Sequence, residues 1–442
     1  MLNTEGSYDL LLTTENAKKM SRKNTLPIIM MIALFFMIAF VTGLQNPFGV
    51  IVKSQFNASN FMSQLGNFAN FIAYACMGIP AGLILQRKGY KITSLIAVGV
   101  GFLGVAITYL SGFMGSATYA VYLCGALISG FSMCILNTVC NPMLNTLAGG
   151  GKKGNQLIQI GGVFGSTGAT LAPVLVGMLM GNAANRTIQD ANPVLWIAMA
   201  IFALAFLVLF FMDMPEPHLA NNDSRDARLE CPQGNKKTGS PFSFRHFNLG
   251  IIAIFIYVGV EVGIPNIANL YMTTDLNMDT AVAGTIVGTY WFLMLIGRFV
   301  GAAIGGQVSS KSMLTATTSI AAILVLCAIL LPQTMVNMPV FKSDISFGIA
   351  EVPVNILLLI LCGLCTSVMW GAIFNLAVEG LGKHTAAASG IFMMMVCGGG
   401  ILPLLQGLVA DNFGFINSYF VVFAGIIYML IYAIAGSKKV EN

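Results

Sequence analysis

Long apolar runs alternate with short polar segments along almost the whole chain. At about 1.5 Å of helical rise per residue, runs of this length can cross the hydrocarbon core of a bilayer. The pattern predicts twelve spanning helices, with six runs on either side of the longest polar break. The runs lie at about residues 28–52, 61–85, 92–113, 118–146, 156–181, 193–212, 247–272, 282–306, 312–332, 351–378, 385–410 and 416–436.

The polar break divides the chain into two predicted halves of similar size. We expect an N-terminal half at 27–212 and a C-terminal half at 247–436, joined by a linker at 213–246 and flanked by tails at 1–26 and 437–442. A weak internal repeat supports this division, because a shift of 230 residues aligns the segment PVLVG with the segment PLLQG. The sequence therefore predicts an all-α membrane protein with two pseudo-symmetric six-helix halves.

Charge fixes the predicted orientation of the helices. If the N-terminus is cytoplasmic, the tails, the linker and the loops on that side carry almost all of the Lys and Arg residues. The opposite side then carries only Lys53, Arg186 and Lys342. Because basic residues concentrate on the cytoplasmic side of membrane proteins, we expect both termini and the linker to be cytoplasmic. The predicted location is the cell inner (plasma) membrane, in which the protein is multi-pass.

Composition agrees with a membrane protein and excludes several other classes. Residues are 56% hydrophobic and only 9% charged, whereas soluble domains have roughly 25% charged residues. The net charge of +5 follows from the orientation and requires no nucleic-acid partner. Eight of the nine cysteines lie in apolar runs and are expected to be small buried hydrophobes. We expect a monomer in the lipid bilayer.

Known catalytic and cofactor motifs are missing from the sequence. The three histidines are isolated and lie near loops, so no metal site is expected. The glycine-rich segments GGGKKG and GLGKHT lack the spacing of a phosphate-binding loop, and no acid, base and nucleophile converge within the runs. The chain is therefore expected to have no catalytic residue and no cofactor, and not to be an enzyme.

One carboxylate, Glu261, lies in the middle of an apolar run. A charge at that depth costs roughly 2.5 to 3.5 kcal/mol on insertion scales, so it usually faces a polar cavity or a partner. We interpret Glu261 as part of a solute or ion pathway and as the candidate carrier of a coupling ion, H⁺ or Na⁺. The alternative is a carboxyl that is protonated or paired for packing alone.

Amide side chains recur inside the predicted spans and favour a neutral, polyhydroxylated solute. Such a solute needs hydrogen-bond donors and acceptors together, and an aromatic surface on which its apolar face can stack. Asn137 and Asn141 are one helical turn apart on a single face. For each amide, the alternative is a hydrogen bond between helices. With Glu261, the candidate substrate-binding residues are Gln45, Asn46, Asn67, Asn137, Asn141, Gln159, Asn266, Trp370 and Asn375.

Three charged residues are candidates for gating. Arg298 lies nearer the cytoplasmic end of its span than Glu261 does, by roughly 9 Å along the helix axis. We therefore expect Arg298 to belong to a cytoplasmic gate or to snorkel towards the membrane surface, in preference to pairing directly with Glu261. Glu379 ends the run at 351–378 on the cytoplasmic side, and Arg87 lies in the loop after the second run.

Several segments resemble a known transporter family. The loop GLILQRKGYK, from Gly82 to Lys91, resembles the loop motif of the major facilitator superfamily, although Gln86 replaces the aspartate of that motif. The segments YVGVEV, LNTVCNP, FGSTGATLAP, NLAVEGLGKHTAAASGI and PLLQG resemble the fucose:proton symporter family, especially its glucose/galactose branch. The resemblance implies the major facilitator fold and the import of hexoses or deoxyhexoses by alternating access, usually with protons.

The chain departs from that family at the positions that the resemblance links to protons. Gln45 and Asn46 stand where the family has an Asn-Asp pair, and Asn137 stands where it often has Glu or Gln. Glu261 is then the remaining acid. We predict a secondary transporter that imports a hexose-type sugar across the inner membrane, coupled to H⁺ or Na⁺. The alternatives are an uncoupled sugar uniporter, a carrier of an amino sugar or another polar solute, and a membrane sugar receptor.

Overall fold

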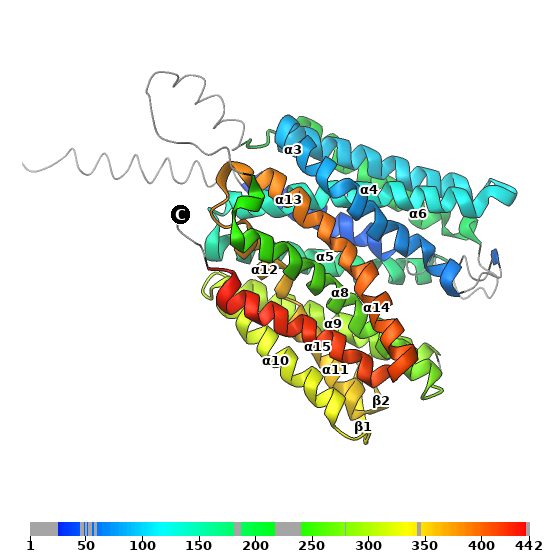
Figure 1. The fold of residues 1–442 in the computed structure, drawn as a ribbon. Coiled ribbons are helices and arrows are strands. Elements are labelled where there is room, and N and C mark those ends of the chain that lie inside the picture. The colour runs from blue at the N-terminus through cyan, green and yellow to red at the C-terminus, as the bar shows by residue number, and fades with distance from the viewer. Residues whose placement is uncertain are drawn as a thin grey trace, which may run out of the picture.

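The computed structural model describes most of the predicted spanning regions. The described residues are 25–44, 48, 51, 55, 56, 60–180, 187–216, 240–278, 280–342 and 346–438. Long helices packed side by side make up nearly all of this part of the chain (Figure 1). Most of the predicted linker at 213–246, and the predicted first span beyond Leu44 in large part, lie outside the described residues.

Among the described residues, the N-terminal part contains a first helix at Thr25–Gly43 and four further helices. These are α3 (Asn60–Ser111), α4 (Thr118–Leu147), α5 (Gly151–Met180) and α6 (Asn192–Phe211), with short 3-10 turns at Gly115–Ala117 and Ile188–Ala191. α3 is two helices that meet at Gly89, whose backbone has φ 82° and ψ 177°. Only glycine adopts that conformation without strain, so the chain turns there between two spans.

The C-terminal part, as far as the structure describes it, contains eight helices and a β-hairpin. The helices are α8 (Arg245–Thr274), α9 (Thr280–Ile304), α10 (Ser310–Leu330), α11 (Val354–Thr366), α12 (Met369–Val378), α13 (Thr385–Met394), α14 (Gly398–Phe413) and α15 (Phe415–Ile431). The strands are β1 (Met335–Phe341) and β2 (Phe347–Pro353). Short helical turns lie at Pro241–Ser243, Gly382–His384, Met395–Cys397 and Tyr432–Gly436.

The helices account for the predicted number of spans. Among the described residues, nine segments are long and apolar enough to cross a membrane, and the pair α11 and α12 adds a tenth. One of the nine, Phe68–Ser111, is the pair of helices that meets at Gly89, and α5 supplies a further span of 30 residues. The prediction of an all-α membrane protein with twelve spans is confirmed.

Two predicted spans are interrupted, and one begins later than expected. α11 and α12 are bent by 40° at Ser367 and Val368, and a 3-10 turn separates α13 from α14. The predicted run at 351–378 starts in error at Glu351, which belongs to β2. β1 and β2 pair antiparallel, from Met335 opposite Pro353 to Phe341 opposite Phe347. Apolar residues at this loop therefore complete a hairpin instead of extending the helix.

The hairpin is held against the N-terminal half of α9. The ring of Phe341 stacks on that of Phe292, with centroids 4.2 Å apart. The backbone N–H of Phe341 donates to Oγ1 of Thr289 at 2.9 Å. Met338 and Val352 are buried beneath the hairpin.

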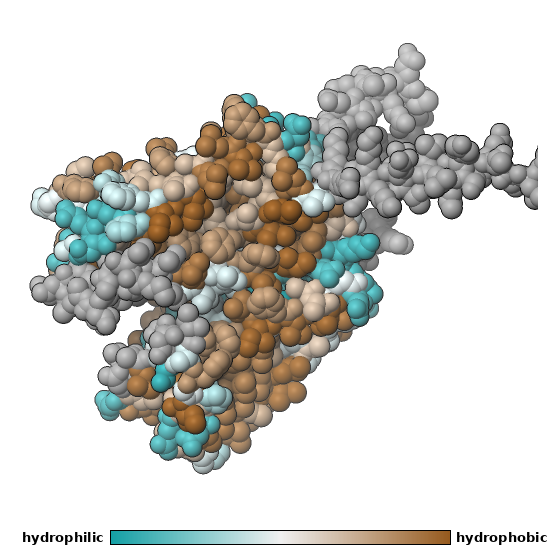
Figure 2. Space-filling model, turned by 180° about the vertical axis from the view of Figure 1, so that it is seen from behind, coloured by the Kyte–Doolittle hydropathy of each residue, from teal (hydrophilic) through white to brown (hydrophobic). Residues whose placement is uncertain are grey.

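The sides of the bundle expose apolar side chains, as a protein in lipid requires. On α6, Leu204 and Phe211 are 64% and 80% exposed, and α14 exposes Leu404 and Leu408. Figure 2 shows hydrophobic residues over much of one face, with many of the hydrophilic residues gathered towards the ends of the molecule. The surface pattern indicates that the hydrocarbon of the bilayer surrounds the middle of the helices.

Helices from the two predicted halves meet at defined places. α3 packs against α4 and α6, and α8 packs against α12, α14 and α15. Contacts between the two groups run from α3 to α13 and from α5 to α9. The residue bounds that we predict for the halves, the tails and the linker stay predictions.

Candidate functional site

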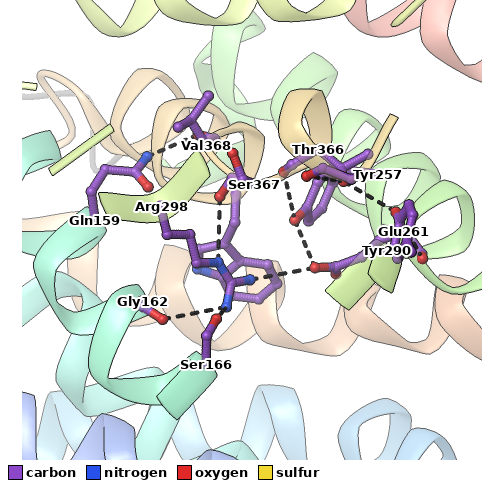
Figure 3. A network of polar contacts seen from close by, with 12 residues as sticks. Gln159, Gly162, Ser166, Tyr257, Glu261, Tyr290, Arg298, Thr366, Ser367 and Val368 are labelled. Atoms are coloured by element: carbon purple, nitrogen blue, oxygen red, sulfur yellow. Dashed lines mark hydrogen bonds and ion pairs between the residues drawn. The ribbon is translucent and has the colours of Figure 1, made fainter. Parts of the chain in front are cut away.

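Glu261 lies halfway along α8 with only 14% of its side chain exposed. Its Oε1 atom accepts a hydrogen bond from the hydroxyl of Tyr257, one turn earlier, at 2.9 Å. The same oxygen lies 3.4 Å from Nη2 of Arg298 on α9. Figure 3 shows these side chains pointing towards one another. The carboxylate therefore has both a hydrogen-bond donor and a cation beside it, which burial of a charge requires.

Arg298 reaches inward, so the expectation that it snorkels towards the membrane surface is wrong. The separation of roughly 9 Å expected between Arg298 and Glu261 measures only the rise along a helix axis. It leaves out the length of the arginine side chain and the close packing of α8 against α9. Nη2 of Arg298 lies 3.4 Å from Oε1 of Glu261, and Nε lies 3.4 Å from the carbonyl oxygen of Ser367. Pairing with a buried carboxylate outweighs solvation at the surface here.

The guanidinium of Arg298 also contacts the N-terminal half, through α5. Nη1 donates to Oγ of Ser166 and lies 3.4 Å from the carbonyl oxygen of Gly162 (Figure 3). One side chain therefore joins α5, α8 and α9. Sequence patterns gave no indication of Ser166, because a small hydroxyl residue in a glycine-rich helix is typical of close helix packing.

Tyr290 completes the surroundings of Glu261. Residue Pro265 has no N–H, so the carbonyl of Glu261 loses its usual helical donor. The hydroxyl of Tyr290 lies 3.2 Å from that carbonyl oxygen and 3.1 Å from Oγ1 of Thr366. Pro265, four residues after Glu261, signals in the sequence that the carbonyl of Glu261 needs another hydrogen-bond donor. The sequence does not show which side chain supplies that donor.

A second polar cluster lies on α4 and contains two of the predicted site residues. Nδ2 of Asn137 donates to the hydroxyl of Tyr74 on α3 at 2.8 Å. Nδ2 of Asn141 donates to the backbone oxygen of Asn137 at 2.9 Å, and Oδ1 of Asn141 accepts from the indole N–H of Trp370 at 3.2 Å. The predicted stripe on this helix therefore forms one connected network.

Trp370 connects this network to the surroundings of Glu261. Its ring meets that of Tyr257 edge to face, with centroids 6.3 Å apart. Because Tyr257 donates to Glu261, the amides of α4 and the carboxylate of α8 lie on either side of two aromatic rings. The structure thus brings Asn137, Asn141, Trp370 and Glu261 into one region between the two halves.

Two predicted site residues use their amides to join helices. Nε2 of Gln159 on α5 donates to the carbonyl oxygen of Val368 at 2.9 Å. Nδ2 of Asn375 on α12 lies 2.7 Å from Oγ of Ser310 and 3.1 Å from the carbonyl oxygen of Gly151. Both residues are 3% exposed. For these two amides the structure therefore shows hydrogen bonds that join helices, which is the alternative to sugar binding.

The remaining predicted residues make none of these contacts or lie outside the described part. Asn266 and Arg87 are exposed, and Glu379 is half-buried with its carbonyl oxygen 2.9 Å from Nε2 of His246. Gln45 and Asn46 lie outside the described residues, as does the side chain of Asn67. Over the described residues, no group of three or more His, Cys, Asp or Glu side chains can hold a metal ion.

A separate cavity of about 250 Å³ lies between α8, α14 and α15. Its lining is apolar apart from Gln406, and Glu261 does not take part in it. A sugar placed there would leave most of its hydroxyls without partners, which costs free energy for each group. The region around Glu261 and Trp370 is therefore the better candidate for binding a polar solute.

Comparisons with known proteins identify the relatives of this chain. The family model described as Major Facilitator Superfamily matches residues 31–402. A glucose/galactose transporter of Brucella abortus biovar 1 (strain 9-941) is 29% identical, over 92% of this chain and 93% of its own length. The L-fucose-proton symporter of Escherichia coli (strain K12) is 25% identical over 89% of each chain.

Solved structures share the fold. The major facilitator transporter FucP, in the outward conformation, superposes with a TM-score of 0.75 at 21% identity, over 93% of this chain and 98% of that one. The proton:xylose symporter XylE, bound to 6-bromo-6-deoxy-D-glucose, superposes with a TM-score of 0.72 at 13% identity, over 94% and 97%. At these identities the likeness establishes the arrangement of the helices.

Proposed function

Because the chain belongs to the Major Facilitator Superfamily, we propose that it is a secondary transporter that imports a hexose-type sugar by alternating access, coupled to a cation. The fold and the relatives are those of transporters, and the protein is not an enzyme. We further propose that it works as a monomer in the cell inner membrane, with both termini cytoplasmic. Its rocking halves would be those at 27–212 and 247–436.

The observation that carries this proposal is the joint position of the amides and the carboxylate between the halves. Asn137 and Asn141 provide amide groups on one side, and Glu261 lies on the other, with Trp370 between them. A sugar needs donors and acceptors for its hydroxyls and an aromatic surface for its apolar face. Relatives named for glucose, galactose and fucose support the hexose class.

Glu261 is the proposed site of coupling. A buried carboxyl can bind and release a cation as the region between the two halves opens to one side of the membrane and then to the other. The candidate ions are H⁺ and Na⁺. Its contacts with Tyr257 and Arg298 hold the carboxyl in place and set how readily it is charged.

One observation favours a second candidate, uncoupled uniport of the same sugar. Glu261 and Arg298 are close enough to neutralise each other, so the pair can serve packing alone. Uniport, transport of an amino sugar or another polar solute, and binding without transport give different results in one experiment.

The experiment is counterflow and net uptake of labelled D-glucose, D-galactose, L-fucose and D-glucosamine in proteoliposomes. We expect counterflow with at least one neutral hexose and accumulation driven by a proton or sodium gradient. Glu261→Gln should keep counterflow and lose accumulation. Accumulation by Glu261→Gln with unchanged dependence on the gradient would refute the coupling assignment, and counterflow without accumulation by the unaltered protein indicates uniport. Preference for D-glucosamine indicates an amino-sugar carrier, and binding without counterflow indicates a receptor.

A further inference from the structure

Resting on the proposed function, we propose that Arg298 is a positioning residue that links the protonation of Glu261 to the contact between α5 and α9. Its guanidinium is shared between the carboxylate of one half and two oxygen acceptors of the other half. The number of these acceptors within reach changes when the halves separate. The protonation of the carboxyl therefore depends on the side of the membrane to which the region between the halves is open.

The distances show how the guanidinium is shared. Ser166 Oγ accepts a hydrogen bond from Nη1, and the carbonyl oxygen of Gly162 lies 3.4 Å from the same atom. Nη2 stands 3.4 Å from Oε1 of Glu261, which is longer than the roughly 2.7–2.9 Å of a strong charge-assisted hydrogen bond. In this conformation the guanidinium is divided between acceptors on α5 and acceptors in the C-terminal half, and its contact with Glu261 is loose.

Other donors on α5 show that this contact closes one end of the molecule. Nζ of Lys152 donates to the carbonyl oxygen of Gln307 at 2.8 Å, and Nε2 of Gln156 donates to that of Ala302 at 3.1 Å. With Gln159 and its acceptor Val368, these side chains form a row along α5, all donating to backbone oxygens of the C-terminal half. The row begins at the end of α5 that we propose to be cytoplasmic.

Opening to the cytoplasm must break this row, and with it the bonds from Arg298 to Ser166 and Gly162. The freed guanidinium then has the carboxyl group of Glu261 within reach. At that point the O–H bond of protonated Glu261 breaks, the proton passes to water on the cytoplasmic side, and the resulting carboxylate pairs with Arg298. The pairing stabilises the charged form, so the proton is released on the cytoplasmic side.

The groups around Glu261 favour a proton over Na⁺ as the ion released. Tyr257 faces the carboxyl from α8 and Arg298 faces it from α9, while the hydroxyl of Tyr290, also on α9, lies 3.2 Å from the backbone carbonyl oxygen of Glu261. The thiols of Cys362 and Cys365 on α11 lie near Tyr290, and the group on α5 is the uncharged hydroxyl of Ser166. A sodium ion needs several oxygen ligands around it and the guanidinium occupies one side of the carboxyl, whereas a proton binds to a single carboxyl oxygen.

The test separates exchange, which requires no proton release, from accumulation, which does. We expect Arg298→Gln to keep counterflow of the transported hexose within about twofold and to lose accumulation by about tenfold or more, since the carboxyl then stays protonated. Arg298→Lys keeps the positive charge and should restore part of the accumulation. Retained counterflow also demonstrates that each variant is folded.

Ser166 supplies a second, independent variant. Ser166→Ala frees Arg298 to approach Glu261, so half-maximal uptake should need an external pH lower by about one unit. Thr167→Ala is the matched control, because the Thr167 hydroxyl donates to Val163 of its own helix at 3.0 Å and its removal should leave the pH profile unchanged.

Two results would overturn the inference: equal losses of counterflow and accumulation in Arg298→Gln, or the same pH profile for Ser166→Ala and Thr167→Ala. If Glu261→Gln loses accumulation while either result appears, the role of Arg298 is wrong and the proposed coupling stands. If Glu261→Gln still accumulates sugar with normal gradient dependence, the proposed coupling is wrong and this inference falls with it.

Discussion

The indole nitrogen of Trp370 on α12 donates a hydrogen bond to Oδ1 of Asn141 on α4, across 3.2 Å. The two residues belong to different halves of the predicted repeat. The contact therefore closes the space between the halves at the level of the candidate site. A sugar that binds there must either keep this bond or replace it with bonds of its own.

Two substitutions of Trp370 distinguish the contribution of its ring from that of its N–H group. Trp370→Phe keeps an aromatic ring near Tyr257 and Phe392 but removes the donor to Asn141. We expect sugar affinity to fall by about 1 kcal/mol, the value of one net hydrogen bond, and Trp370→Ala to lose more, since the stacking surface is also removed. Isothermal titration calorimetry on purified protein measures the affinity.

The matched control for this prediction is Trp196→Phe. Trp196 lies on α6 with 57% of its surface exposed on the side of the bundle. Its replacement should leave sugar affinity unchanged. Equal losses at Trp196 and Trp370 would assign the effect of both to general stability.

Asn137 tests whether the amides of α4 bind sugar or only join helices. Its Nδ2 donates to Tyr74 at 2.8 Å and to the carbonyl oxygen of Met133 at 3.1 Å. If Asn137 binds the sugar, Asn137→Ala should weaken binding by at least about 1 kcal/mol. Tyr74→Phe removes only the helix-to-helix partner and should lower the Tm with little change in affinity. A change in Tm without a change in affinity for both variants would make Asn137 a packing residue.

The sequence indicated the spans and singled out Glu261 and the amides of Asn137 and Asn141 as site candidates, because each of these features has a local physical signal. Spanning runs follow from the absence of water in the bilayer, which forces every backbone group into a helix. Glu261 stands out because a charge is rare at that depth. Asn137 and Asn141 fall on one face through the helical period alone.

The partners of these residues could not be predicted in the same way. Gln159 and Asn375 donate to backbone oxygens, which every residue carries, so no pattern marks the acceptor. The contact between Arg298 and Glu261 depends on how α8 and α9 lie beside each other, which spacing along one helix does not contain. The hairpin at β1 and β2 depends on contacts with Phe292 and Thr289 of α9.

Gly390 should control how closely the two halves approach. It lies on α13, where an added Cβ atom would come within 2.5 Å of the carbonyl oxygen of Gly78 and 2.6 Å of Cα of Gly82, both on α3. Such a contact with backbone cannot be relieved by a rotamer change. We expect Gly390→Ala to shift the protein towards a conformation in which α3 and α13 are apart.

Single-molecule fluorescence between dyes on α3 and α13 measures that shift, which should appear as a larger population at long distance. Gly407→Ala on α14 is the control, since an added Cβ there meets no atom within 4 Å. The same distance distribution for Gly390→Ala and the unaltered protein would show that α3 and α13 can yield without separating.

Glu216 should stabilise the start of the helix that follows Gly89. The backbone N–H groups of Tyr90 and Lys91 donate to its two carboxylate oxygens at 2.7 and 2.8 Å. The first N–H groups of a helix have no partner within it, so this carboxylate acts as a cap supplied from the segment that follows α6. Glu216→Ala should cost about 1–2 kcal/mol of stability and lower the Tm in detergent. Glu216→Gln keeps one side-chain oxygen as an acceptor, so its Tm should lie between those of the unaltered protein and of Glu216→Ala.

The control is Asp213→Ala. Asp213 is an exposed acid on the same segment, and its replacement should leave the Tm nearly unchanged. A similar drop for Asp213→Ala would mean that the negative charge of the segment, and not the cap, stabilises this end of the protein.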